Sequence, residues 1–351
     1  MTVAAIGDRQ MLPIQTKQIR YAATRESLPG SRLHARGAGG FDGPMKIGFG
    51  APVSGSWATP GNQIEIAQRA EALGYHSLWT FSRLLYPDAP EGQRLTSPYR
   101  SVHDPLVIAA FLAGVTSRVR LGLAVVNLPF YAPLVLAKAL NSIDVVSNGR
   151  LDAGLGLGWE PEEFIAAGVD IARRGARAEE FVACLRAIWS DDPVEFAGEF
   201  YTVPRGFVDP KPVQQPHPPI LLGGSAEVAL RRVGRLADGW ISASRFQSSQ
   251  VAATVTTIRG AAETAGRDPE QIRIVIRGSL RLRDADHPDD PTMTGTVQKI
   301  RADLDAYAAA GATEIFLDLN FDEQIGSPDA DPARSMAVAH EVLETFAPED
   351  A

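Results

Sequence analysis

The sequence predicts an α/β protein, and specifically a (β/α)8 TIM barrel. From Met45 onward, short runs rich in β-branched and aromatic residues alternate with longer stretches of helical spacing. There are eight such units, and eight parallel strands with alternating helices close most economically into a barrel. The predicted strands are 46–50, 76–81, 119–126, 151–156, 219–222, 239–242, 272–278 and 313–319. The predicted helices lie near 61–73, 104–117, 133–147, 161–168, 174–190, 226–237, 247–266, 296–311 and 332–347.

An open, doubly wound sheet is the competing fold, because it uses the same alternation of strands and helices. The length of 351 residues allows either two domains or one large barrel. The number of units favours one barrel domain over 45–351. Residues 191–218 interrupt the alternation with a predicted hairpin at 194–203 and a proline-rich stretch. This insertion is too small to bury its own core, so we assign it to the barrel.

Local chemistry predicts several helix boundaries. Asp104 precedes Pro105, which places a capping carboxylate before a proline at the first helical position, where no backbone donor is lost. Gly74 follows the first helix and tolerates the left-handed conformation of a helix C-cap. Asn148 and Gly149 end the third helix in the same way.

Residues 1–44 differ in composition from the rest of the chain. They carry six basic and three acidic side chains, show no sustained apolar period, and end in a glycine-rich run before Pro44. We interpret them as a flexible N-terminal extension, since short biased termini are usually disordered. A targeting or interaction arm is the alternative, although no stretch has the apolar core of a signal peptide.

Charge and composition exclude several classes of protein. Acidic side chains outnumber basic ones by 42 to 34, and the net charge of −8 disfavours nucleic acid or an anionic membrane surface as the partner. No apolar run is long enough to span a bilayer. Cys184 is the single cysteine, so a reducing, cytoplasmic compartment is expected. No cluster of His, Cys, Asp and Glu has metal-ligand spacing, and we predict no metal site.

The loops after the carboxyl ends of the strands build the site in a barrel of this kind. Gly223-Gly224-Ser225 lies at a strand-to-helix junction, where the missing side chains let a phosphate approach free N–H groups and the positive end of a helix. A tight turn that needs unusual φ angles explains the same glycines about as well.

Three further features lie near strand ends. Gly154-x-Gly156-x-Gly158 is one position short of a dinucleotide fingerprint. Close approach of a flat ring system explains it better, with small residues in a crowded barrel mouth as the alternative. His103 either faces the site or is a solvated loop histidine. Aromatic residues near strand ends suit either a cofactor pocket or the barrel core, and these are Trp57, Trp79, Trp159 and Trp240.

An ordered series of motifs extends from Gly149 to Trp240. It comprises Gly149-Arg150, Gly156-x-Gly158-Trp159, Glu163-Phe164, Gly168, Arg174-Gly175, Glu180, Trp189, Phe196-x-Gly198, Pro210-x-Pro212, Pro218-Pro219, Gly223-Gly224-Ser225 and Asp238-Gly239-Trp240. This series resembles the luciferase-like monooxygenase superfamily, and within it the branch that uses the deazaflavin coenzyme F420. The resemblance covers essentially all of 45–347, and the ordered series is far more specific than any one motif.

The resemblance implies a (β/α)8 barrel, usually a homodimer, with a flavin or deazaflavin in its mouth. The ring would rest on a bulge at the end of the third strand, which often contains a non-prolyl cis peptide and falls here on Val125, Val126 and Asn127. The other positions that the resemblance assigns to the coenzyme are Ser82, Leu157, Gly158, Glu162, Gly223, Gly224, Ala226 and Glu227.

The sequence departs from the family pattern at two places. Ser82-Arg83 replaces an Asp-His pair that many relatives carry, and Trp159 stands where the sugar-phosphate dehydrogenase branch has a glutamate. The acid/base groups of that branch are therefore absent, and we expect no glucose-6-phosphate activity. Arg83, His103 and Trp159 are the substrate-side candidates. Arg83 either steadies an anionic substrate or the coenzyme by a bidentate contact, or forms an ordinary surface salt bridge.

The combined prediction is an oxidoreductase that transfers a hydride between F420 and a small organic substrate. The protein would bind the coenzyme, exclude water and orient the substrate, while the coenzyme carries the redox chemistry. A monooxygenase that uses reduced FMN and oxygen is the alternative on the same barrel. A non-catalytic flavin-binding barrel is a third hypothesis.

Overall fold

The central sheet is built from nine short strands in the computed structural model, which describes residues 44–90 and 92–348. Each predicted strand is confirmed to within one or two residues, except that the third is interrupted into two pieces. The strands are β1 (Lys46–Gly50), β2 (Ser77–Thr80), β3 (Arg120–Leu123), β4 (Val126–Asn127), β5 (Leu151–Gly156), β8 (Ile220–Gly223), β9 (Gly239–Ile241), β10 (Arg273–Ser279) and β13 (Glu314–Asp318).

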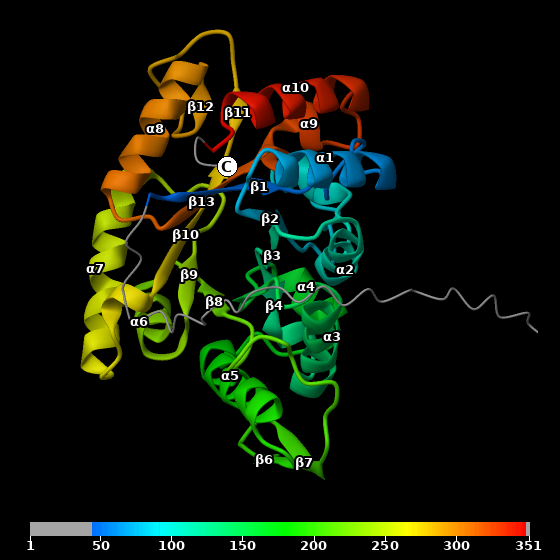
Figure 1. Ribbon diagram of the computed structural model, residues 1–351, viewed down its shortest axis with the longest axis vertical. Coiled ribbons are helices and arrows are strands. Elements are labelled where there is room, and N and C mark those ends of the chain that lie inside the picture. The colour runs from blue at the N-terminus through cyan, green and yellow to red at the C-terminus, as the bar shows by residue number, and fades with distance from the viewer. Residues whose placement is uncertain (1–43, 91, 349–351) are drawn as a thin grey trace, which may run out of the picture. The chain divides into compact units, whose positions relative to one another are not determined.

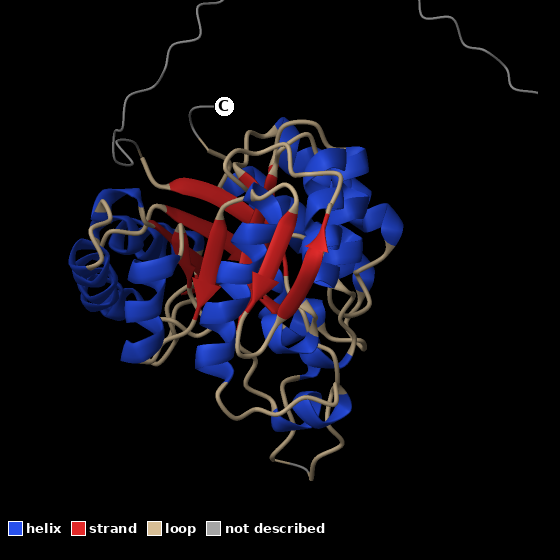
Figure 2. Cartoon of the chain, turned by 90° about the horizontal axis from the view of Figure 1, so that it is seen from below, coloured by secondary structure: helices blue, strands red, loops and turns tan. Residues whose placement is uncertain are grey.

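The sheet closes on itself. Its strand order is β3-β2-β1-β13-β10-β9-β8-β5-β4, and β3 also pairs in parallel with β5 through Leu121 and Leu151. β3 and β4 share one position of the barrel, so eight parallel positions form a ring with no free edge. The (β/α)8 barrel is therefore confirmed, and the open doubly wound sheet is wrong. Figure 1 and Figure 2 show the helices surrounding the strands.

The helices follow the predicted pattern, with one short addition, α9. The Asp104 carboxylate caps α2 as predicted, since it accepts hydrogen bonds from the N–H groups of Leu106 and Val107 at 2.9 and 3.0 Å. The helices are α1 (Pro60–Ala72), α2 (Pro105–Val115), α3 (Pro133–Val146), α4 (Pro161–Ala166), α5 (Arg174–Ser190), α6 (Glu227–Leu236), α7 (Ser248–Thr264), α8 (Val297–Ala309), α9 (Glu323–Gly326) and α10 (Pro332–Thr345).

The predicted hairpin in the insertion is confirmed. β6 (Val194–Ala197) and β7 (Thr202–Gly206) pair antiparallel, and the Glu180 carboxylate of α5 accepts hydrogen bonds from the N–H groups at the hairpin tip, residues 199–201. A parallel pair, β11 (Arg281–Leu282) with β12 (Thr294–Gly295), was not predicted. Strands of two residues carry too little periodicity to be recognised in a sequence.

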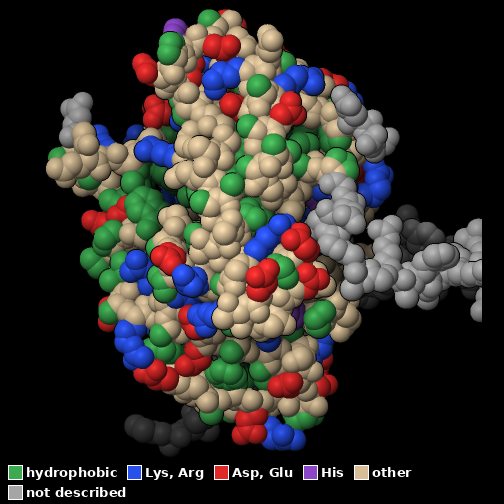
Figure 3. Space-filling view, turned by 90° about the vertical axis from the view of Figure 1, so that its left-hand side faces the viewer, with side chains coloured by type: hydrophobic (Ala, Val, Ile, Leu, Met, Phe, Trp, Pro, Cys, Tyr) green, Lys and Arg blue, Asp and Glu red, His purple; other side chains and the backbone are tan. Residues whose placement is uncertain are grey.

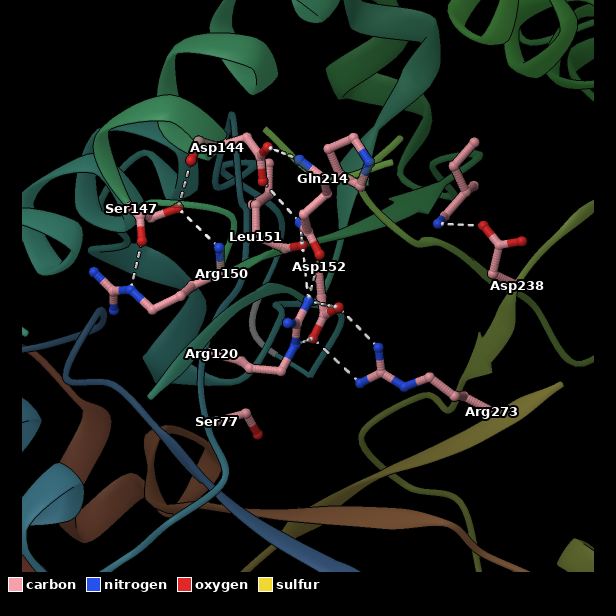
Figure 4. A network of polar contacts seen from close by, with 12 residues as sticks. Ser77, Arg120, Asp144, Ser147, Arg150, Leu151, Asp152, Gln214, Asp238 and Arg273 are labelled. Atoms are coloured by element: carbon pink, nitrogen blue, oxygen red, sulfur yellow. Dashed lines mark hydrogen bonds and ion pairs between the residues drawn. The ribbon is translucent and has the colours of Figure 1, made fainter. Parts of the chain in front are cut away.

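An ion network closes the barrel at the amino ends of the strands (Figure 4). Asp152 is fully buried and pairs with Arg120 at 2.6 Å and Arg273 at 2.7 Å, while Arg273 also pairs with Glu314 at 2.8 Å. Burial opposes ionisation of Asp152, but the two arginine charges outweigh it and hold its pKa well below the usual range. Removal of one partner would leave a buried charge uncompensated.

An apolar layer fills the barrel between this network and the carboxyl ends of the strands. The indole of Trp79 stacks on Phe316 with ring centroids 5.1 Å apart. Gly122 makes room for the indole, because a Cβ atom there would lie 2.2 Å from it. The other buried members of this layer are Ala124, Leu221, Ile241 and Val275.

Three predictions concern the N-terminal extension, membrane-spanning helices and metal sites. The extension over 1–44 lies almost wholly outside the described residues, so the division at residue 44 stays a prediction. Among residues 44–90 and 92–348, no helix is both long and apolar enough to cross a membrane, and no group of three acidic, His or Cys side chains is arranged to hold a metal ion.

The face that carries α7 and α8 intermixes basic and acidic side chains (Figure 3).

Candidate active site

A cavity of about 1020 Å³ opens at the carboxyl ends of the barrel strands. Its walls come mainly from the segments that follow β2, β3, β5, β8, β9, β10 and β13. This is the end of a (β/α)8 barrel that carries active sites. The predicted site residues that line it are Ser82, Arg83, Val125, Asn127, Leu157, Gly158, Trp159, Gly223, Gly224 and Ala226.

A bulge between β3 and β4 forms one wall. The peptide bond between Ala124 and Val125 is cis, and the Ser82 hydroxyl donates a hydrogen bond to the Val125 carbonyl at 2.6 Å. Val125 and Asn127 line the cavity. The side chain of Val126 is fully buried in the core instead, because successive side chains of a strand point to opposite faces. The Val126 side chain therefore does not line the cavity, and the prediction that it contacts the coenzyme is corrected.

The glycines after β5 accommodate this bulge. A Cβ atom at Gly154 would lie 1.7 Å from the Leu123 carbonyl oxygen, and one at Gly156 would lie 2.4 Å from the Val125 side chain. Close packing of neighbouring strands thus explains Gly154, as the crowded-mouth alternative stated. Gly156 and Gly158 also line the cavity, and Gly158 has a φ of +69°.

The turn between β8 and α6 is open to the cavity. Gly223, Gly224, Ser225 and Ala226 all line it, and α6 begins at the next residue. The buried Trp240 indole donates a hydrogen bond to the Gly224 carbonyl at 2.7 Å and holds the turn in place. Gly224 has a φ of +136°, so the unusual-turn explanation holds for this residue. The exposed helix start also suits an anion, and the two explanations are compatible.

The cavity wall is strongly cationic. None of its described residues is Asp, Glu, Lys or His. A concave wall of one sign of charge attracts and holds a ligand of the opposite sign. This charge contrasts with the net −8 of the whole chain. The wall contains six arginines, namely Arg83, Arg94, Arg174, Arg245, Arg277 and Arg281.

Arg83 is a buried member of this set. Its guanidinium contacts two aromatic rings, 4.6 Å from the Tyr99 centroid and 4.7 Å from that of Trp159, and these two centroids lie 6.5 Å apart. Its Nη1 is 3.1 Å from Oε2 of Glu163, and the Arg83 side chain is only 4% exposed. The alternative of an ordinary surface salt bridge is therefore wrong.

Arg277 is the second buried arginine of the wall. Its Nε lies 3.3 Å from a carboxylate oxygen of Asp318, and its Nη2 donates to the Ala124 carbonyl in the bulge. Burial lowers the pKa of Arg277, and the charge of Asp318 opposes that shift. The guanidinium also lies within 5.1 to 5.4 Å of three ring centroids, those of Phe81, Phe316 and Phe321.

Comparison with known sequences identifies the family. Residues 45–287 match the family model described as luciferase-like monooxygenase. The chain belongs to the luciferase-like monooxygenase family. Rv0940c, an uncharacterized protein of Mycobacterium tuberculosis, is 33% identical over 63% of this chain and 81% of its own. The FMNH2-dependent dimethylsulfone monooxygenase of Pseudomonas putida is 28% identical over 77% of this chain and 74% of its own.

Solved structures share the barrel of this luciferase-like protein. Monooxygenase RslO1 from Streptomyces bottropensis superimposes with a TM-score of 0.71 at 24% identity, over 88% of this chain and 100% of that chain. The coenzyme F420 dependent tetrahydromethanopterin reductase from Methanopyrus kandleri gives 0.65 at 16% identity, over 87% and 100%. Likenesses at these identities show the fold.

Three predicted site residues lie outside the cavity wall. The luciferase-like resemblance or the position after a strand end had placed them in the site. His103 is exposed, and its backbone N–H donates to the Val53 carbonyl at 2.9 Å. Glu162 is exposed on the first turn of α4. Glu227 is exposed and pairs with Arg231 one turn later, at 2.6 Å. These placements correct the predictions for all three side chains, since each faces solvent rather than the cavity.

The tryptophans divide between core and cavity in this luciferase-like barrel. Trp57, Trp79 and Trp240 are fully buried, so the core alternative is correct for them. Trp159 lines the cavity and is 56% exposed. It is therefore the cavity-facing member of the four.

Several wall residues escaped the sequence reasoning. Arg277 follows the apolar run 274–276 inside a predicted strand, and a charge in such a position is the signal that could have identified it. Tyr99 and Phe321 come from short 3-10 helices, Ser97–Arg100 and Leu319–Phe321, which are too short to show a periodicity. The described wall offers hydroxyl groups, including those of Ser82 and Tyr99, but neither carboxylates nor imidazoles. Its chemistry is thus binding and orientation, without a carboxylic or imidazole acid or base.

Proposed function

We propose that this protein is an oxidoreductase that binds coenzyme F420 in the cavity and transfers a hydride between it and a small organic substrate. The observation that supports this most is a cavity wall that combines exposed arginines with the open turn after β8. A coenzyme with phosphate and carboxylate groups matches both features. The family assignment supports redox chemistry in a barrel of this kind.

The residues present fit such a group. The glycine turn Gly223-Gly224-Ser225 leaves space for a phosphate, because a Cβ atom at Gly223 would meet nothing closer than 3.7 Å. We assign the ring system to the wall formed by Val125 and Asn127 in the bulge. When bound, the coenzyme supplies a hydride donor or acceptor, and the chain binds it, orients the substrate and excludes water.

Exposed arginines at the cavity favour F420 over FMN. Arg94, Arg174 and Arg245 are exposed and line the cavity. FMN ends in one phosphate, whereas F420 adds a chain of glutamate carboxylates beyond its phosphate. A wall with surplus exposed guanidinium groups is better matched to the second ligand, since each carboxylate gains an oppositely charged partner.

Reduced FMN is the second candidate coenzyme. The relative from Pseudomonas putida is by name FMNH2-dependent and aligns with 77% of this chain. In that case the same cavity would hold reduced FMN, and the protein would be a monooxygenase that uses oxygen.

Titration of the purified full chain with each coenzyme tests the proposal. Binding is followed by the fluorescence anisotropy of F420 and of FMN, with equilibrium dialysis as the second measurement. We expect saturable F420 binding that weakens as salt is raised, because the contacts are ionic. Tight FMN binding without F420 binding would replace our assignment by the monooxygenase. If both coenzymes bind but no enone, quinone or alcohol oxidises or reduces them, the non-catalytic alternative is favoured.

We also propose that the protein is a homodimer through the adjacent helices α2 and α3. These helices pack against each other and carry a group of exposed apolar side chains. A group of this kind on one face marks an interaction surface. Its members are Val107, Leu134, Val135, Val145 and Val146, which are 64%, 39%, 64%, 38% and 60% exposed.

A further inference from the structure

Two nitrogens of the Arg83 guanidinium have no hydrogen-bond acceptor in the described part of the chain. Its Nε and Nη1 atoms are buried and have no acceptor among the described residues, although Glu163 lies within ion-pair distance. The other oxygen of that carboxylate accepts from the backbone N–H groups of Leu84 and Leu85 at 2.6 and 3.2 Å. Buried donors without acceptors are unfavourable, and each one in a native protein calls for an explanation such as a bound water or ion or a functional contact.

The two rings that cover Arg83 differ in their surroundings. Tyr99 is packed against Phe321, with centroids 5.3 Å apart, and belongs to the fixed wall. Trp159 is 56% exposed and lines the cavity. Its ring plane is inclined by 68° to that of Tyr99, so the two rings contact the guanidinium from adjacent directions, with the indole on the side of the cavity. The indole is therefore the neighbour of Arg83 that a ligand can displace.

An apolar surface continues from this arginine along the wall. The ring of Tyr99 lies 6.2 Å from that of Phe81, and Phe81 lies 5.0 Å from Phe321. Phe81 and Phe321 also contact Arg277, at 5.3 and 5.1 Å from their centroids, and its Nε likewise has no hydrogen-bond acceptor among the described residues. A ligand that fits this wall has an apolar or aromatic body and an anionic group.

This region is separate from the turn that we assign to the coenzyme phosphate. Arg83 follows β2, whereas Gly223 ends β8, and the positions of β3 with β4 and of β5 lie between them around the barrel. The two anion-binding elements thus belong to different walls of one cavity. One coenzyme phosphate accounts for the second element and leaves the first for another ligand.

We propose that Arg83 binds the carboxylate or sulfonate group of the substrate, with Trp159 as a displaceable cover. The substrate class is then small organic anions with an apolar body, held against Tyr99 and Phe321. This inference rests on the proposed function for the identity of the second ligand as a substrate. The anion contact itself is independent of which coenzyme is used.

The test uses two pairs of probes that differ in charge but little in shape: benzoate against benzamide, and hexanoate against hexanamide. Binding to the full chain is measured by calorimetry and by tryptophan fluorescence, with and without saturating F420. The variants are Arg83→Gln and Trp159→Phe. Arg173→Gln is the matched control, because Arg173 also pairs with a glutamate and stacks on an aromatic ring, that of Phe200, but lies outside the cavity.

We expect at least one anion to bind the wild-type protein at least about tenfold more tightly than its amide. Arg83→Gln should weaken that binding at least about tenfold and leave F420 binding unchanged, while Arg173→Gln changes neither. Trp159→Phe should remove most of the fluorescence response and keep the anion bound. If Arg83→Gln does not fold, Arg83→Lys, which keeps the charge but loses the planar fork, should weaken anion binding in its place.

Three results would overturn the inference. Equal affinities for anion and amide would exclude the proposed charge contact with Arg83. Undetectable binding of both anions would exclude it as well. Parallel loss of F420 and anion binding in Arg83→Gln assigns Arg83 to the coenzyme. Failure of the proposed function looks different: neither F420 nor FMN would bind the wild-type protein, while the anion would still bind through Arg83.

Discussion

The guanidinium of Arg277 donates a hydrogen bond to the carbonyl oxygen of Ala124 and so connects the end of β10 with the bulge between β3 and β4. The two segments belong to opposite walls of the barrel mouth. A carboxylate oxygen of Asp318 lies 3.3 Å from Nε of Arg277 and forms an ion pair with the guanidinium. The shape of the bulge wall is therefore set partly by a side chain that lies more than 150 residues later in the chain.

Replacement of Arg277 by glutamine should destabilise the fold strongly. The change leaves the buried carboxylate of Asp318 without its cation, and loss of one member of a buried pair costs about 3–5 kcal/mol. Urea denaturation followed by circular dichroism measures the free energy of unfolding. Arg277→Lys, which keeps the charge, should recover part of the loss. A free energy of unfolding within about 0.5 kcal/mol of wild type for the glutamine variant would contradict this account.

Two substitutions of Gly223 distinguish the effect of charge on coenzyme affinity from the effect of side-chain size in the proposed phosphate site. Gly223→Ala should keep the fold, because its Cβ atom would lie no closer than 3.7 Å to any neighbour, and it should weaken coenzyme binding less than an acidic residue does. Gly223→Asp should weaken F420 binding at least about tenfold with little change in the melting temperature, since a carboxylate would face the phosphate. Anisotropy titration of the three proteins gives the dissociation constants. Equal affinities for all three would remove the phosphate assignment from this turn.

Glu160 should make stability depend on pH between about 5 and 8. Burial, together with the neighbouring carboxylate of Glu162, raises the pKa of Glu160 from its ordinary 4.5 to about 7. The folded state therefore favours the protonated acid, and stability is lost as pH rises from 4.5 through about 7. The neutral Glu160→Gln variant should gain melting temperature relative to wild type as pH is raised from 5 to 8.

Thermal melts at pH 5, 6, 7 and 8 measure this difference. Glu195→Gln, at an exposed position on β6, controls for the loss of one negative charge. A difference between Glu160→Gln and wild type that stays constant over this range would show that Glu160 does not titrate there.

Glu71 should show the opposite dependence on pH. Burial opposes its ionisation, but the N–H groups of Arg118, Val119 and Ser117, at 2.6 to 2.9 Å, outweigh burial and lower the pKa of Glu71 to about 2. Its contribution to stability is present above pH 4.5 and is lost as pH falls through about 2. Glu71→Gln should therefore cost about 1 kcal/mol at pH 7, a value reduced for partial exposure, and less at pH 3.

Urea denaturation at pH 7, 5 and 3 tests this dependence. Glu263→Gln, at an exposed position on α7, is the control, with little effect at any pH. A cost for Glu71→Gln that is equal at pH 7 and pH 3 would contradict the anchoring role of its carboxylate.

A charge on the exposed face of α3 should dissociate the proposed dimer. Val135 is 64% exposed, and Val135→Asp would place a carboxylate in an apolar interface, where burial of an unpaired charge is costly. Light scattering coupled to size-exclusion chromatography should report a dimer for wild type and a monomer for this variant. Val228→Asp, at a 65% exposed position on α6, should stay dimeric. A wild-type monomer, or dissociation by Val228→Asp instead, would refute this interface.

The sequence by itself determined the architecture. Alternating strand and helix periods, with capping signals such as Asp104 before Pro105, specified the eight barrel units, because these signals are local and repeat along the chain. The end of the barrel that carries the cavity followed as well, since strand direction decides which loops meet there. Gly223 and Gly224 were recognisable at that end because an absent side chain is visible in the sequence.

Only the tertiary structure decided which side chains face the cavity. The Arg83 side chain is buried against Tyr99 and Trp159, and His103 faces solvent, although each follows a plausible strand end. Arg277 became part of the wall through a contact with the bulge. Such placements depend on strand register and on packing between segments far apart in the sequence, where a shift of one residue turns a side chain to the other face. Local periodicity carries no information about that choice.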